Sequence, residues 1–148
     1  MDYGKAFKQY RRSSIETASK LELVIMCYEK SILCLQQSKD HIIDKDFMKK
    51  GEKIKKVLDI INELQANLNL DKGGTIAKTL DSLYTYLTNR IILADVQKNL
   101  TIFDECINIL SELKSGWEGI RPEQEEQLSP VNAAVPQEIR RLSHQVAA

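Results

Sequence analysis

Apolar residues recur at intervals of three and four along almost the whole stretch from Leu21 to Trp117, and this pattern limits the possible folds more than any other feature. Such spacing places apolar side chains on one face of an α-helix. The six glycines and three prolines are too few for the many turns of a β-sandwich or barrel. The pattern therefore predicts an all-α protein.

Four separate helices are expected within this stretch. Ser19 and Glu22 form a Ser-x-x-Glu capping box, and Asp44 or Asp46 can cap the second helix. The pair Gly73-Gly74 can adopt the positive φ values found where helices stop. The predicted helices span residues 19–42, 47–70, 75–94 and 97–116. Because the connections are short, neighbouring helices must alternate in direction, which predicts an antiparallel up-down four-helix bundle.

The two ends of the chain differ from the predicted bundle, residues 19–117. Residues 1–18 form a short N-terminal segment with too few apolar side chains for a stable free helix. Residues 118–148 begin as a polar, acidic linker and end in an amphipathic tail. The tail places three apolar residues on one face: Ile139, Leu142 and Val146. It is either a frayed end or a short helix that docks onto the bundle, and both interpretations stay open.

Charge and hydropathy exclude several partners. Lys+Arg and Asp+Glu both total 21, so no net field attracts the chain to nucleic acid or to an anionic membrane. The longest apolar run, residues 23–28, is far shorter than the ~20 residues that span a bilayer. The first residues lack the apolar core of a signal peptide. We therefore expect a cytoplasmic protein whose three cysteines are reduced core residues.

The residues required for common enzyme chemistry are missing from the sequence. His41 and His144 are the only histidines, and neither belongs to the Glu-x-x-His pattern of a bundle metal site. The sequence has neither a P-loop nor the glycine pattern of a dinucleotide-binding motif. We therefore expect no catalytic residues, no metal site and no cofactor.

The predicted helices carry more apolar residues than one bundle face needs, which is about three positions in seven. The additional positions are Ile60 in the second helix, Tyr84, Tyr86 and Ile92 in the third, and Ile102, Cys106, Ile109 and Leu113 in the fourth. Leaving a Leu or Ile exposed forfeits ~1.5–3 kcal/mol, so an exposed row of them is typical of a docking site. The alternative is a thick core in which broad helix faces meet.

Several blocks of the sequence form a distinctive set: YRRSSIETAS (10–19) leading into LELVIMCYE (21–29), IINEL (60–64), LDKGGTIA (70–77), LYTYL (83–87) and residues 110–117. Together these blocks resemble the FliS family of flagellar export chaperones. The blocks keep the order of the family across residues 3–118. One departure is Lys20, where the family usually has proline; both are compatible with a first helical position. The tail from Glu118 resembles nothing in the family.

The resemblance implies a cytosolic four-helix bundle that binds the disordered C-terminal segment of flagellin. Such a protein prevents premature filament assembly and aids export by the flagellar type III secretion apparatus. The resemblance also implies that residues 1–18 cover part of the binding groove and move when flagellin arrives. Tyr10 matches the family tyrosine in this segment. The free protein would be a monomer or a weak homodimer.

The predicted partner contacts combine this movable segment with the apolar rows of the helices. They are Tyr10, Ile15, Ile60, Leu64, Leu68, Tyr84, Leu87 and Ile91, followed by Ile102, Cys106 and Ile109 as a second choice. An alternative function is a regulatory adaptor that binds a regulator of flagellar gene expression. A carboxylate-bridged metal enzyme on the same bundle would need inward carboxylates and histidines that the sequence lacks.

Overall fold

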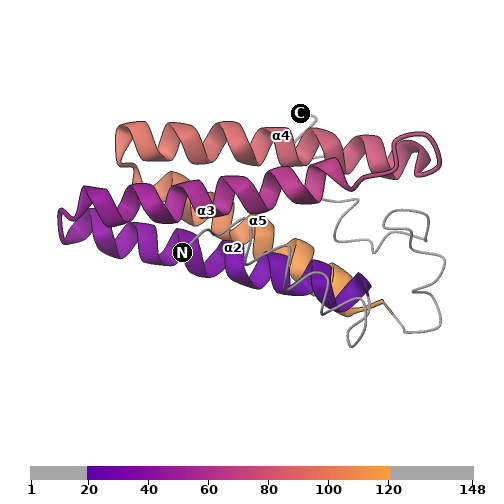
Figure 1. The fold of residues 1–148 in the computed structure, drawn as a ribbon, viewed down its shortest axis with the longest axis horizontal. Coiled ribbons are helices and arrows are strands. Elements are labelled where there is room, and N and C mark those ends of the chain that lie inside the picture. The colour runs from indigo at the N-terminus through magenta and orange to yellow at the C-terminus, as the bar shows by residue number, and fades with distance from the viewer. Residues whose placement is uncertain (1–19, 121–148) are drawn as a thin grey trace.

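The computed structural model describes residues 20–120, which form four α-helices and no strand. The helices are α2 (Lys20–Ile43), α3 (Phe47–Ala66), α4 (Gly74–Gln97) and α5 (Leu100–Glu118) (Figure 1). Helix α2 packs against α3 and α5, and α4 packs against the same two helices. The helices therefore form a ring in which α2 and α4 face each other across the core. This arrangement confirms the predicted all-α, antiparallel four-helix bundle.

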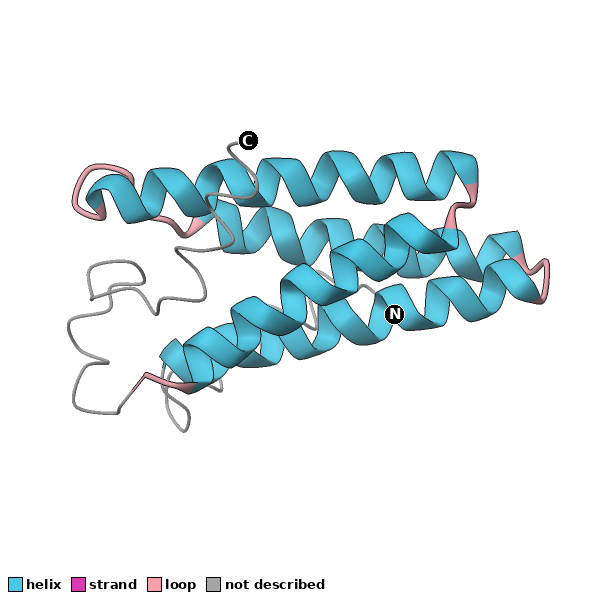
Figure 2. Ribbon diagram, turned by 180° about the vertical axis from the view of Figure 1, so that it is seen from behind, coloured by secondary structure: helices cyan, strands magenta, loops and turns pink. Residues whose placement is uncertain are grey.

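The connections lie at two opposite ends of the bundle (Figure 2). The turns that follow α2 and α4 share one end, and the longer loop between α3 and α4 lies at the other. Both views also show the start of α4 diverging from the start of α2 (Figures 1 and 2). The predicted movable segment 1–18, Ser19 of the capping box and the tail beyond Ile120 lie outside the described residues.

Side-chain caps fix the starts of α3 and α5. The carboxylate of Asp46 accepts a hydrogen bond from the backbone N–H of Lys49 at 3.2 Å, which confirms one of the two predicted caps. The Asn99 side chain accepts from the backbone N–H groups of Thr101 and Ile102 at 3.0 and 3.3 Å. These bonds satisfy amide donors that have no partner in the first helical turn. Asn99 starts α5 three residues later than predicted, after Lys98 has ended α4 with a φ of 51°.

The predicted end of the second helix at Leu70 is wrong, because α3 stops at Ala66. The Asn67 amide donates to the backbone carbonyl of Glu63 at 2.7 Å, and the Asn69 side chain accepts from the N–H of Lys72 at 2.9 Å. Asparagine side chains compete in this way with the backbone bonds that would extend a helix. The apolar spacing continues through Leu68, and periodicity alone therefore misses this earlier end.

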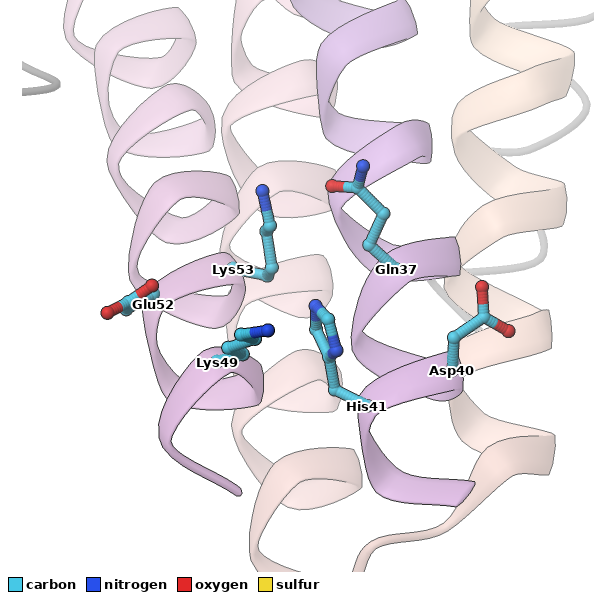
Figure 3. A pocket seen from close by; sticks show the side chains of 6 residues that line it. All are labelled: Gln37, Asp40, His41, Lys49, Glu52 and Lys53. Carbon is cyan, nitrogen blue, oxygen red and sulfur yellow. The ribbon is translucent and has the colours of Figure 1, made fainter. Parts of the chain in front are cut away.

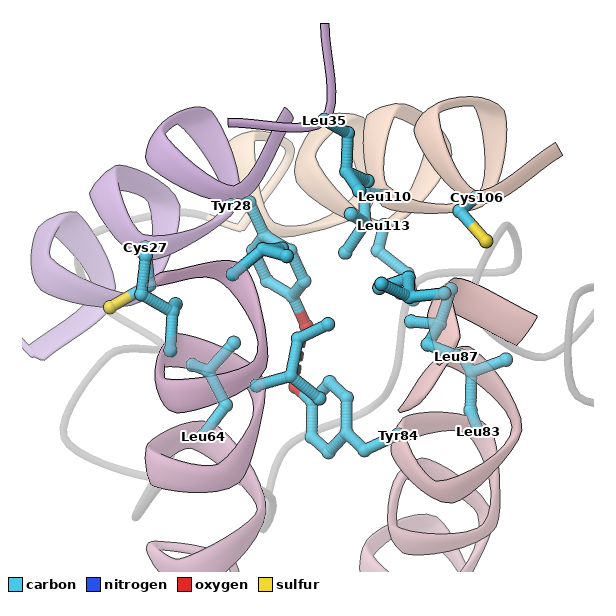
Figure 4. Close-up of a cluster of buried hydrophobic side chains, with 14 of the residues drawn as sticks. Cys27, Tyr28, Leu35, Leu64, Leu83, Tyr84, Leu87, Cys106, Leu110 and Leu113 are labelled. Atoms are coloured by element: carbon cyan, nitrogen blue, oxygen red, sulfur yellow. Dashed lines mark hydrogen bonds between the residues drawn. The ribbon is translucent and has the colours of Figure 1, made fainter. Parts of the chain in front are cut away.

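One cluster of apolar side chains, drawn from all four helices, forms the core. Figure 4 shows Leu35 of α2, Leu64 of α3, Leu87 of α4 and Leu110 of α5 within it. Burial of each such side chain is worth ~1.5–3 kcal/mol relative to exposure. The three cysteines are reduced and buried in the same interior. Hydrophobic burial therefore holds the ring of helices together.

Candidate functional site

A polar contact between three aromatic side chains crosses the centre of this apolar core. The hydroxyl oxygens of Tyr28 on α2 and Tyr84 on α4 lie 2.5 Å apart (Figure 4). The indole Nε1–H of Trp117 on α5 donates to the Tyr28 hydroxyl oxygen at 3.1 Å. Both tyrosines are buried. This contact joins the two diagonal helices directly, and it recruits α5 through the tryptophan.

Burial changes the acidity of these hydroxyls. Desolvation raises the pKa of Tyr28 to about 12, against the opposing effect of its hydrogen bonds with Tyr84 and Trp117. Desolvation also raises the pKa of Tyr84 well above its usual value, and the neighbouring Tyr28 adds to that rise. Both side chains are therefore neutral hydrogen-bonding groups at physiological pH.

A charged cluster links α4 to α5 nearer the surface. The Glu105 carboxylate accepts hydrogen bonds from Arg90 Nε at 2.9 Å and Nη2 at 3.2 Å, and from the Tyr86 hydroxyl at 2.9 Å. The hydrogen bonds from Arg90 are the main reason that the pKa of Glu105 is lowered. Because every one of these groups already has a partner, the cluster acts as a structural link between two helices.

Two further polar links join α4 to α3. The Gln65 amide donates to the Asp81 carboxylate and to the Thr85 hydroxyl, both at 2.9 Å. Lys50 Nζ lies 2.6 Å from Asp95 Oδ1. The partners on α4 are spaced so that they line one edge of that helix. These links mark the seam between α3 and α4.

The structure buries most of the residues that the sequence predicted as partner contacts. The buried ones are Ile60, Leu64, Tyr84, Leu87, Ile91, Ile102 and Cys106. Leu68 and Ile109 are partly exposed and pack against the core. Tyr10 and Ile15 lie outside the described residues. The expectation that the additional apolar positions are exposed is therefore wrong for Ile102, Cys106 and Leu113 of α5, and also for Ile60 of α3 and Tyr84 of α4.

The geometry of the ring explains this burial. Each helix has a neighbour on either side and also faces the interior, so a broad arc of its surface is covered. On α5, Phe103, Leu110 and Trp117 form one buried row, and Ile102, Cys106 and Leu113 form a second. The additional rows therefore thicken the core, as the alternative interpretation of the sequence allowed. The role of these residues as partner contacts stays a prediction.

A different set of apolar side chains is exposed. They are Met26, Leu33 and Ile43 on α2, Phe47 and Met48 on α3, Leu70 in the following loop, and Ile92 and Val96 on α4. Met48 is 80% exposed and Val96 is 73% exposed. Of this set, the sequence analysis singled out Ile92 alone. The others interrupt polar helix faces or lie at helix ends, where three-and-four spacing carries little information.

Four of these exposed residues lie on α3 and α4 at the end of the bundle that carries the two short turns. Phe47 and Met48 start α3, while Ile92 and Val96 lie one turn apart near the end of α4. Lys98 Nζ lies 4.7 Å from the centre of the Phe47 ring, which places the start of α3 beside the end of α4. Apolar side chains exposed in this way can bind an apolar segment of a partner.

A cavity between α2 and α3 has a different character. It measures about 400 Å³ and is lined by Gln37, Asp40, His41, Lys49, Glu52 and Lys53 (Figure 3). Its lining residues include two lysines and two carboxylates, and no large apolar side chain is among them. Binding pockets for drug-sized ligands are mostly apolar with a few polar groups. This cavity therefore does not have the lining of a small-molecule or apolar-peptide site.

Two searches of the described helices gave negative results. Within residues 20–120, no three His, Cys, Asp or Glu side chains are grouped so that they could hold a metal ion. None of the helices α2 to α5 combines the length and the apolar character needed to cross a membrane. The class defined by the fold is thus the antiparallel four-helix bundle, with apolar side chains exposed on three helices.

Comparison with known proteins identifies the family within this class. The family model described as flagellar protein FliS matches residues 3–124. The flagellar secretion chaperone FliS of Vibrio cholerae is 37% identical over 111 residues, which cover 75% of this chain and 82% of the relative. FliSB of Pseudomonas aeruginosa is 33% identical over 120 residues, 78% of this chain and 95% of the relative. FliS of Salmonella typhimurium is 31% identical over 120 residues, which cover 80% of this chain and 89% of the relative. The chain belongs to the FliS family, which confirms the resemblance found in the sequence.

Proposed function

We propose that this protein is a cytoplasmic chaperone that binds the disordered C-terminal segment of flagellin. In this role it prevents premature polymerisation and aids export by the flagellar type III secretion apparatus. The observation that carries the proposal is the FliS family match across residues 3–124, with relatives named flagellar secretion chaperones. The role requires no catalytic step, metal ion or cofactor.

The exposed surface suits a disordered guest. A disordered segment pays the entropy of ordering when it binds, so it needs a large surface with many modest contacts. Apolar side chains are exposed on α2, α3 and α4. Met26 and Leu33 lie along α2, while Ile43, Phe47, Met48, Ile92 and Val96 lie toward the end of the bundle with the two short turns. A guest that wraps around the bundle can reach several of them in turn.

The predicted contact residues fall into two groups, those that a guest can reach on the surface and those that are buried. Leu68 and Ile109 are partly exposed, so a guest can reach them while the bundle stays closed. The buried positions, such as Ile60 and Leu87, can contribute only where helices move apart. Tyr10 and Ile15 are proposed from the family resemblance.

Isothermal titration with the last ~50 residues of the cognate flagellin tests this function, because a segment of that length can offset its ordering cost. We expect Ile92→Ser and Val96→Ser together to weaken binding by about tenfold or more, since apolar burial is lost. Asn89→Ser is the matched control, because Asn89 is an exposed polar residue on the same helix. Equal affinity in all variants would remove the α4 surface from the site.

The regulatory adaptor is the competing outcome of the same experiment. No binding of the flagellin segment by the unmodified protein, together with binding of a flagellar gene-expression regulator, would replace the chaperone function. The experiment therefore separates an error in the proposed surface from an error in the proposed function.

We also propose that the free chain is a monomer or a weak homodimer. A stable protein–protein interface buries about 800 Å² on each partner and usually has a compact apolar centre. The exposed apolar side chains here are distributed over three helices. Sedimentation equilibrium is expected to show mainly monomer at micromolar concentration; a tight dimer would contradict this.

A further inference from the structure

The hydrogen bonds at the centre of the bundle do not use all the donors present. Three donor hydrogens meet there: the Nε1–H of Trp117 and the two hydroxyl hydrogens of Tyr28 and Tyr84. An indole N–H can only donate, so the two hydroxyl oxygens are the only acceptors in this group. Two hydrogen bonds are formed, at 3.1 and 2.5 Å. One of the three hydrogens therefore has no acceptor.

Both possible directions of the Tyr28–Tyr84 bond give the same result. If Tyr28 donates to Tyr84, the hydroxyl hydrogen of Tyr84 has no acceptor. If Tyr84 donates, the Tyr28 oxygen accepts twice and its own hydrogen has no acceptor. Within residues 20–120 neither hydroxyl makes another hydrogen bond. Each hydroxyl already has at least one hydrogen-bond partner, and the remaining hydrogen is available to an acceptor that comes from outside these residues.

The start of α4 is the part of the bundle that can admit such an acceptor. Gly73 gives this helix no side-chain cap, and Gly74 follows with a φ of 59°. Within the described part of the chain, side chains of residues 74–80 form no hydrogen bond or ion pair with another helix. The first polar link from α4 to a neighbour is made by Asp81. Residues 74–80, the first two turns of α4, are therefore held by apolar contacts alone, whereas Asp81 in the turn before Tyr84 is linked to Gln65.

We propose that the Tyr28–Tyr84 pair donates its spare hydroxyl hydrogen to a backbone carbonyl oxygen of the guest polypeptide. The guest reaches the pair when the first turns of α4 move away from α2. This inference rests on the proposed function and adds the interior of the bundle to the binding site. An extended guest has carbonyl oxygens without partners, whatever its side chains. A backbone contact of this kind suits a chaperone that must hold a disordered segment.

Trp117 is a natural reporter of this contact, because it is the only tryptophan in the chain and bonds directly to Tyr28. The experiment titrates the unmodified protein with a flagellin C-terminal segment that lacks tryptophan. Calorimetry follows binding, fluorescence follows Trp117, and amide exchange follows residues 74–84. We expect a change of Trp117 emission that saturates together with the binding heat, and faster exchange at the start of α4.

The Tyr28→Phe/Tyr84→Phe double variant removes both hydroxyls and therefore tests the spare hydrogen whichever tyrosine carries it. The variant is expected to bind the segment about five- to tenfold more weakly, the effect of one lost hydrogen bond. Tyr86→Phe on α4 is the control, because its hydroxyl bonds to Glu105 on the side of α5. The control is expected to bind as the unmodified protein does.

The outcomes separate the inference from the proposed function. Binding with unchanged Trp117 emission, unchanged exchange and full affinity in the Tyr28→Phe/Tyr84→Phe variant would overturn the inference and leave the chaperone function in place. A buried water molecule would then be the acceptor. No binding at all by the unmodified protein would overturn both.

Discussion

The two helices that face each other across the core, α2 and α4, are attached to their neighbours in different ways. Both halves of α2 are linked to α5, by the ion pair of Lys39 with Asp104 and by Lys114, whose Nζ lies 3.8 Å from Glu29. Helix α2 also packs more extensively against α3 and α5 than α4 does. Helix α4 packs less extensively but makes more polar links to its neighbours, through side chains from Asp81 to Asp95, and its residues 74–80 make apolar contacts alone.

This difference shows that burial and attachment are separate properties. Leu35 on α2 and Leu80 on α4 are both fully buried, so both helices contribute to the same core. Surface ion pairs add little to stability, and the links of α2 therefore matter more for position than for free energy. We infer that α2 is the fixed side of the bundle and that the start of α4 is the side that can move.

The largest expected effect comes from creating a cavity in the core, on the α2 side or on the α4 side. Leu35→Ala should lower the free energy of unfolding by about 4–5 kcal/mol and Leu80→Ala by about 2–3 kcal/mol, because a mobile helix can relax into the cavity. Urea unfolding followed by circular dichroism measures both values. Equal losses would mean that the start of α4 is held as firmly as α2.

Alkaline pH should weaken the contact that joins the two helices. Burial raises the pKa of Tyr28 and of the Cys106 thiol to about 12, above the values these groups have in an unfolded chain. The folded state therefore keeps protons that the unfolded state releases. Each contribution is complete below the unfolded pKa of its group, about 8.5 for the cysteine and about 10 for the tyrosine, and then declines up to pH ~12 by about 1.4 kcal/mol per pH unit.

Guanidinium unfolding at a series of pH values between 8 and 11 checks this decline. The Tyr28→Phe/Tyr84→Phe double variant is the control, and its stability should fall less steeply above pH ~10, where the tyrosines of an unfolded chain ionise. Identical slopes for the two proteins would show that the tyrosines ionise equally well in the folded state.

The sequence predicted the bundle because helical periodicity depends on local spacing, which survives in any packing arrangement. It also predicted the cap at Asp46, since capping depends on residues only three positions apart. The burial of Tyr84 could not be predicted in the same way. Its hydroxyl forms a hydrogen bond with Tyr28, a residue 56 positions away, and nothing local indicates that partner.

The predicted site failed for a related physical reason. Periodicity identifies one apolar face for each helix, whereas Cys106 lies on a second face that only a neighbouring helix can cover. Conversely, Met48 and Val96 belong to no apolar row, and the structure leaves them exposed. Exposure depends on which helices become neighbours, and that information is spread over the whole sequence.

The smallest expected effects come from replacing a glycine near the start of α3 or of α4 by alanine. A Cβ added at Gly51 of α3 would meet no atom within 4 Å, so Gly51→Ala should stabilise the protein by about 0.5–1 kcal/mol through lower chain entropy. Gly74 has a φ of 59°, which an L side chain rarely adopts. Gly74→Ala should therefore destabilise by about 1 kcal/mol or more. Thermal unfolding measures both shifts, and a stabilising Gly74→Ala would mean that the start of α4 does not depend on this left-handed residue.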